Sequence, residues 1–181
     1  MKKVIFLLSL VLILGVWLVS CGGGDDEDEC PDISGNYQVT KQIQKVKCWD
    51  ANNNEITLSS TDGVMDTNTT LKVNQLGCDL VVTEDYQGIP IPYTGFVDVD
   101  DYFEFDIESP DQLELTLTLD MPQPIGTIQC KFSGYIYWTG DVVDSNLTGK
   151  VVYDLDKHPN ETNSNCPESV KINATFNAQK Q

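Results

Sequence analysis

The chain has 181 residues, with 28 acidic against 11 basic side chains and a formal net charge of −17. Every basic residue is a lysine. A surface of this charge repels phosphate backbones, and without arginine it lacks the planar group that binds phosphate and guanine in a bidentate manner, so the composition argues against nucleic-acid binding.

Residues 1 to 20 have the pattern of a secretory leader. Lys2 and Lys3 precede an apolar run that continues to Leu18, and this run of about 15 residues is shorter than the roughly 20 needed to span a bilayer. It ends in Leu18-Val19-Ser20-Cys21, which resembles the lipobox of bacterial lipoproteins. The resemblance implies cleavage before Cys21, attachment of diacylglycerol to its thiol, and acylation of the new amino terminus. Two or more acyl chains give stable membrane anchoring.

Residues 21 to 32 are predicted to be the lipidated cysteine followed by a glycine-rich acidic tether. Consecutive glycines and like charges, as in GGGDDEDE, favour an extended, unfolded segment. By resemblance to lipoprotein sorting rules, Gly22 stands where inner-membrane lipoproteins of enteric bacteria carry aspartate, which implies the outer membrane. Whether the protein faces the periplasm or the cell surface stays open.

Residues 33 to 181 are predicted to form a single all-β domain. Their apolar residues alternate with polar ones and are punctuated by Gly, Pro, Asn and Asp, as in strands and hairpins. No segment shows a helical period. We predict strands near residues 36–47, 69–76, 79–84, 94–99, 102–108, 113–119, 126–138, 146–156 and 169–177.

Short connections between these strands predict an antiparallel meander of eight or nine strands, closed as a barrel or, alternatively, folded as a β-sandwich. Ile33-Ser34-Gly35-Asn36-Tyr37 resembles the Gly-x-Trp motif that opens the first strand of lipocalins, with tyrosine in place of tryptophan. The domain length is also similar, so the resemblance implies a lipocalin-like barrel. The overall plan resembles that of uncharacterised lipoproteins of Gram-negative bacteria, which implies no particular activity.

Five cysteines follow Cys21 and lie, on this interpretation, in an oxidising compartment where disulfides form. Cys130 and Cys166 fall at the same end of the predicted meander, so we expect them to pair. Cys78 shares an end with Cys48 if residues 56–59 form an extra strand, and with Cys30 if they do not. We favour Cys48 with Cys78, which leaves Cys30 as a free or intermolecular thiol.

The sequence contains no convincing catalytic or metal-binding pattern. Its single histidine, His158, precedes a proline in a predicted loop, and no CxxC pair is present. We therefore expect a non-enzymatic protein without a cofactor or a metal, and a hydrolase is the least favoured alternative.

Two groups of residues are candidates for binding. Residues 89–93, Ile-Pro-Ile-Pro-Tyr, form a stiff apolar segment that includes Tyr93, and Tyr135, Tyr137 and Trp138 cluster near the end of a long strand. Both groups could line a barrel mouth; alternatively, the prolines mark a sheet edge and the aromatic residues fill the core.

The first hypothesis for function is a membrane-anchored binder of an apolar small molecule or lipid. The alternative is a structural or interaction protein with a solid core, whose partner is another envelope protein. A large apolar cavity would favour the former, and a filled interior would favour recognition through the surface.

Overall fold

A computed structural model of the chain describes residues 29–181. The predicted leader, Cys21 and most of the predicted tether lie outside the described residues. The described elements are β1 (Gly35–Trp49), β2 (Glu55–Ile56), β3 (Asn68–Leu76), β4 (Asp79–Tyr86), β5 (Ile89–Val97), β6 (Tyr102–Ile107), the 3₁₀ turn η1 (Pro110–Gln112), β7 (Leu115–Met121), β8 (Gly126–Val143), β9 (Asn146–Lys157) and β10 (Ser169–Lys180). Within residues 29–181, no helix is long and apolar enough to cross a membrane.

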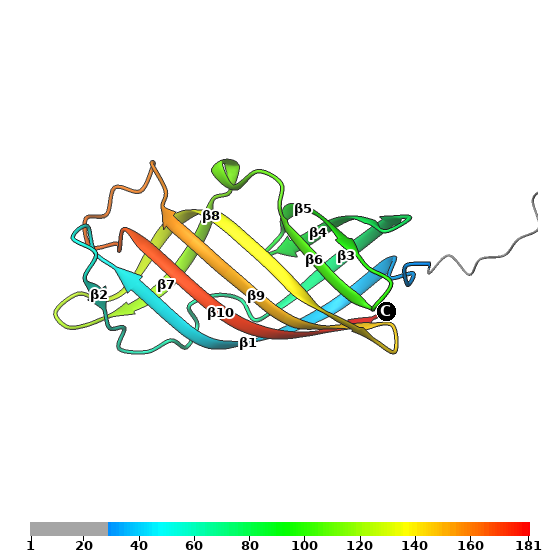
Figure 1. Cartoon of the computed structure of the whole chain (residues 1–181). Coiled ribbons are helices and arrows are strands. Elements are labelled where there is room, and N and C mark those ends of the chain that lie inside the picture. Colours follow the sequence, from blue (N-terminus) through cyan, green and yellow to red (C-terminus); the bar gives the residue numbers. More distant parts are fainter. Residues whose placement is uncertain (1–28) are drawn as a thin grey trace, which may run out of the picture.

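Eight of the strands close into an antiparallel barrel, in the order β1–β3–β4–β5–β6–β8–β9–β10 (Figure 1). The barrel closes because β10 pairs with β1 from Tyr37↔Lys180 to Trp49↔Ser169. This result confirms the predicted barrel and excludes the sandwich. It also brings both ends of the described chain together, since the Gln181 N–H donates to the Asn36 carbonyl at 2.9 Å.

The barrel continues beyond its closed part because β8 is long enough to pair with two strands on one edge. Its second half, from Tyr137 to Asp141, pairs with β6, and its first half, from Gly126 to Phe132, pairs with β7. Residues 57–67 cross the free edge of β7, where the Ser59 N–H donates to the Asp120 carbonyl. The short strand β2 pairs with the end of β1 in this same extension.

Each predicted strand is present, the short strand β2 is additional, and the largest departures from the predicted bounds are in β5 and β8. Residues 89–93, expected as a segment between strands, form the start of β5, and β8 continues to Val143 rather than ending at Trp138. The predicted alternation holds: Leu115, Leu117 and Leu119 are buried on one face of β7, and β6 buries its phenylalanines in the same way. The barrel interior is the hydrophobic core.

Two glycines allow β8 and β9 to approach closely where the barrel curves. Gly140 and Gly149 lie opposite one another in the register of these strands. A Cβ atom on either residue would lie 2.0 Å from a carbonyl oxygen of the facing strand. Any larger residue at these positions would push the strands apart, so both glycines are needed for this close approach.

The disulfides agree with one predicted pair and contradict the other. Cys130 is bonded to Cys166, as expected, but Cys78 is bonded to Cys30, so the expected pairing of Cys48 with Cys78 is wrong. Cys48 is a free, fully buried thiol, and burial raises its pKa to about 11.

The strand register explains the error. Ile56 does pair beside Cys48, but the chain then runs back along the barrel before β3 begins opposite Thr40. The turn after β3 therefore lies at the end where β1 starts, and Cys78 meets Cys30. Residues 30–32, predicted as part of the tether, are consequently fixed to the barrel.

Candidate functional site

The four predicted binding residues do not form one site. Tyr93 and Trp138 have no exposed surface and point into the barrel, whereas Tyr135 and Tyr137 are 63% and 40% exposed on its outside. Neighbouring residues of a strand point to opposite faces of the sheet, and this alternation separates Tyr137 from Trp138. The second predicted group is therefore divided, because Trp138 joins Tyr93 inside the barrel while Tyr135 and Tyr137 lie on its outer surface.

The inner cluster is built around a buried ion pair. The Lys41 Nζ atom of β1 lies 2.5 Å from Glu84 Oε1 of β4, and both side chains have no exposed surface. The Tyr93 hydroxyl donates to the other oxygen, Glu84 Oε2, at 2.6 Å. Both carboxylate oxygens are thus paired inside the barrel.

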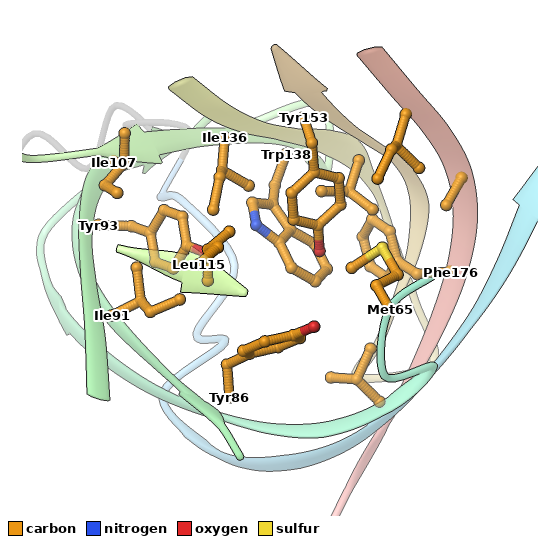
Figure 2. Packing of buried hydrophobic residues seen from close by; sticks show 14 of the residues in the cluster. Met65, Tyr86, Ile91, Tyr93, Ile107, Leu115, Ile136, Trp138, Tyr153 and Phe176 are labelled. Atoms are coloured by element: carbon orange, nitrogen blue, oxygen red, sulfur yellow. The ribbon is translucent and has the colours of Figure 1, made fainter. Parts of the chain in front are cut away.

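Aromatic side chains surround the lysine. Lys41 Nζ also donates to the Tyr153 hydroxyl at 2.8 Å and lies 5.0 Å from the ring centre of Trp138. Tyr86 faces these residues from the opposite wall of the barrel (Figure 2), with its ring centre 5.6 Å from Nζ. A cation held over aromatic faces in a dry interior is stabilised by the electron density of the rings.

The interior favours neutral phenols. Burial raises the pKa of both Tyr93 and Tyr153 well above its ordinary value, and the nearby charge of Glu84 raises it further. One polar group is left over: the buried Trp138 Nε1 atom has no hydrogen-bond partner among the described residues, although it faces the Tyr93 side chain in Figure 2.

The barrel is filled at the level of this cluster. Trp138, Tyr93, Phe103 and Ile136 are each fully buried, with no surface accessible from the inside or the outside. Their rings pack against one another, for example Trp138 against Phe105 with centroids 5.6 Å apart. A ligand of several hundred cubic ångströms has no space between these side chains.

A groove of about 410 Å³ lies instead at the edge of the closed barrel, where β5 begins and β6 ends. Its walls include Ile89, Ile91, Ile107 and Leu113, together with polar residues of the segment around η1. We call this feature the edge groove. Residues 89–92 lie along this groove, whereas Tyr93, the residue of the segment that was predicted to bind, is buried in the core. The groove volume falls in the range of small-molecule sites.

The prolines of β5 remove hydrogen-bond donors from the strand edge that borders the edge groove. The Pro92 carbonyl accepts a hydrogen bond from the Glu108 N–H, so Pro92 turns its backbone away from β4. Pro90, two residues earlier, turns the same way, and neither residue has an N–H to donate. This edge therefore cannot pair with an added strand, which agrees with the interpretation of the prolines as edge markers.

The outer cluster is also centred on a carboxylate. Glu104 Oε2 of β6 accepts hydrogen bonds from the Tyr137 hydroxyl at 2.7 Å and the Tyr102 hydroxyl at 3.1 Å. The hydrogen bond to Glu104 is the main cause of a raised pKa at Tyr137, whereas desolvation is the main cause at Tyr102. Phe96 of β5 packs against Tyr102 with ring centroids 6.3 Å apart.

His158 is placed in a structural rather than a reactive setting. Its Nδ1 atom accepts a hydrogen bond from the Asn160 N–H at 3.1 Å, and its Nε2 atom lies 4.0 Å from Glu114 Oε2. In the described part of the chain, no three His, Cys, Asp or Glu residues are grouped so as to hold a metal ion.

Sequence reasoning missed Lys41, Glu84, Tyr86 and Tyr153. A signal for the ion pair was present, because Lys41 continues the buried alternation of Tyr37 and Val39 in β1. Glu84 likewise continues that of Leu80 and Val82 in β4. A charged residue at a core position of each of two strands predicts a buried ion pair.

In comparisons with known proteins, no family model and no curated protein matches this chain. Its function must therefore be argued from the two clusters and the edge groove.

Proposed function

We propose that this chain is a lipid-anchored protein of the bacterial outer membrane, whose solid barrel is a non-enzymatic module that recognises another envelope component through its surface. The leader and the lipobox residues before Cys21 support the anchor. Gly22 supports the outer membrane over the inner one.

The filled interior is the observation that carries the proposal. A barrel that encloses a ligand needs a cavity, but here Lys41, Glu84 and the surrounding aromatic rings occupy the centre, and both charged groups are hydrogen-bonded within the cluster. Opening that space would separate a buried charge pair, which costs several kcal/mol. The surface is therefore the part of the molecule available for recognition.

Native mass spectrometry of the detergent-solubilised full chain tests the solid barrel. We expect a mass that is explained by the protein and its acyl chains, with no further compound after organic extraction. A stoichiometric apolar metabolite in the extract would contradict the proposal.

The anchor has its own test. We expect a palmitate analogue supplied to the cells to label the protein, and the Cys21→Ser variant to lose both the label and its place in the outer-membrane fraction. An unlabelled protein that nevertheless sediments with the outer membrane would contradict lipid anchoring.

A second candidate function is favoured by the edge groove alone. The groove has a volume of about 410 Å³ and is lined by Ile89, Ile91 and Leu113 together with polar residues that include Glu108, Gln112 and Glu114, which fits a small amphipathic molecule. Were this the function, extraction would yield a compound whose occupancy falls in a Leu113→Trp variant, because the larger ring fills the groove.

A further inference from the structure

The outer surface of β5, β6 and β8 joins aromatic rings to carboxylates that have no cation of their own. We call this surface the acidic aromatic face; it consists of Phe96, Tyr102, Glu104, Asp106, Tyr135 and Tyr137. None of these side chains is buried, and Phe96, Tyr135 and Tyr137 are among the exposed large apolar residues of the barrel.

The strand register places an aromatic ring beside each of the two carboxylates. Phe96 lies directly opposite Glu104 between β5 and β6, and Tyr137 lies directly opposite Asp106 between β6 and β8. Directly opposed residues have Cβ atoms about 5 Å apart, so each carboxylate and its ring can contact the same ligand group.

Glu104 is held in place but not neutralised. Two tyrosine hydroxyls bind Oε2, and no ion pair among residues 29–181 includes Glu104 or Asp106. Strands β5 and β6 contain no lysine, and the one lysine of β8, Lys131, pairs with Glu114. The inner carboxylate, Glu84, is by contrast bound by the Lys41 ammonium on one oxygen and by the Tyr93 hydroxyl on the other.

Arginine is the side chain that fits this combination. Its planar guanidinium donates hydrogen bonds to carboxylates and stacks on an aromatic face, and a net charge of −17 attracts it. The two hydroxyls occupy only Oε2 of Glu104, so Oε1 is open to a guanidinium N–H. Glu104 and Asp106 are two residues apart on one strand, which places them about 7 Å from each other. Alternate residues of an extended peptide have the same spacing.

We propose that the acidic aromatic face binds an extended segment of a partner protein that carries arginine at alternate positions. One arginine lies between Phe96 and Glu104 and the next between Tyr137 and Asp106. This assignment rests on the proposed recognition function, and it names the chemistry of the partner.

The proposal can be tested by titrating the full chain, in detergent, into a fluorescently labelled peptide of alternating glycine and arginine and measuring the fluorescence anisotropy of the peptide. We expect saturable binding that weakens as salt is added. Glu104→Gln should weaken it about fivefold and the double variant Glu104→Gln/Asp106→Asn about twentyfold, because each removes a charged contact of about 1 kcal/mol. Phe96→Leu should weaken it about threefold.

The matched control is Asp62→Asn, which removes the same charge from an exposed loop residue. It should change the affinity by less than about twofold, since exposed charges at a distance are screened. An effect equal to that of Glu104→Gln would overturn the proposal, because binding would then follow net charge alone.

Two peptide controls test the ligand chemistry. Citrulline in place of arginine keeps the shape and removes the charge, and a peptide with contiguous arginines keeps the composition and removes the alternation. Equal binding of either peptide would overturn the proposal. If no peptide binds and native mass spectrometry finds no bound metabolite, the proposal of an alternating-arginine partner is wrong. The proposal of a solid barrel that recognises another envelope component is then unaffected.

Discussion

Glu84 and Glu104 lie on opposite faces of the same sheet and have different partners. Both accept hydrogen bonds from tyrosine hydroxyls, Glu84 from Tyr93 and Glu104 from Tyr102 and Tyr137. Glu84 is fully buried and paired with Lys41, whereas Glu104 is partly exposed and has no cationic partner in the described part of the chain.

The two clusters have different roles, although each consists of a glutamate that accepts hydrogen bonds from tyrosine hydroxyls. A charge pair inside the barrel affects stability strongly, because water cannot replace a lost partner. The carboxylate outside is solvated, so it can change partners at little cost to the fold. The inner cluster therefore maintains the barrel, and the outer cluster is available to a ligand.

The largest expected effect comes from breaking the inner ion pair. Lys41→Met should lower the free energy of unfolding by about 3 to 5 kcal/mol, because it leaves a buried carboxylate without its cation. Urea denaturation followed by tryptophan fluorescence measures this loss. The double variant Lys41→Met/Glu84→Gln should recover most of the lost stability, and a loss below about 1 kcal/mol in the single variant would contradict the buried-pair interpretation.

Alkaline pH should act on the inner tyrosines. The pKa of Tyr93 and of Tyr153 is raised in the folded state, so above pH of about 10 the unfolded chain releases protons that the folded chain keeps. The contribution of the two tyrosines to the free energy of unfolding is therefore fully present below that pH. Above it, the free energy of unfolding falls by up to about 1.4 kcal/mol per pH unit for each tyrosine.

Urea denaturation at a series of pH values between 8 and 11.5 checks this slope. The measurement should be made in a Cys48→Ala background, because the buried thiol also keeps its proton in the folded state. Burial also raises the pKa of Tyr37 and Tyr86, so these phenols add to the same slope. A flat stability profile above pH 10 would show that the two phenols are not buried.

Substitutions of two neighbours on β8 compare the faces directly. Trp138→Phe should cost about 1 to 3 kcal/mol through the lost buried volume. Tyr137→Phe, which removes only an exposed hydroxyl, should stay within about 1 kcal/mol of the parent. Thermal unfolding of the two variants decides the matter, and equal losses would contradict the assignment of these residues to opposite faces.

The smallest expected effect on stability is at the outer carboxylate. Glu104→Gln should change the free energy of unfolding by less than about 1 kcal/mol, because the residue is not buried. It should nevertheless lower the pKa of Tyr137, whose rise depends first on the hydrogen bond to Glu104. A titration followed by tyrosine ¹³C NMR measures this change, and an unchanged Tyr137 pKa would show that the contact does not form in solution.

The barrel itself could be predicted because its signals are local. Strict alternation in residues such as Leu115, Leu117 and Leu119 fixed the buried face of each strand, and short connections implied antiparallel neighbours. The same alternation shows why the aromatic cluster at residues 135–138 could not be one binding site. Tyr137 and Trp138 are consecutive in a strand, so only one of them can face inward.

The site could not be predicted in full because its pairs are distant in sequence. Lys41 and Glu84 lie 43 positions apart, and their contact depends on which strands become neighbours. The cysteines posed the same problem, because the route of residues 57–67 along the barrel decides whether Cys78 meets Cys48 or Cys30. A single sequence does not specify that route.

The bond between Cys30 and Cys78 determines how a mechanical load would enter the barrel. Around it, Gln75 of β3 accepts a hydrogen bond from the Ile33 N–H and donates one to the Pro31 carbonyl. A pull on the chain ahead of residue 30 is therefore transmitted covalently to the hairpin of β3 and β4, and it does not peel β1 away from β10. Tension on the amino-terminal side would be shared by several strands, and the barrel would stay closed under shear from its surroundings.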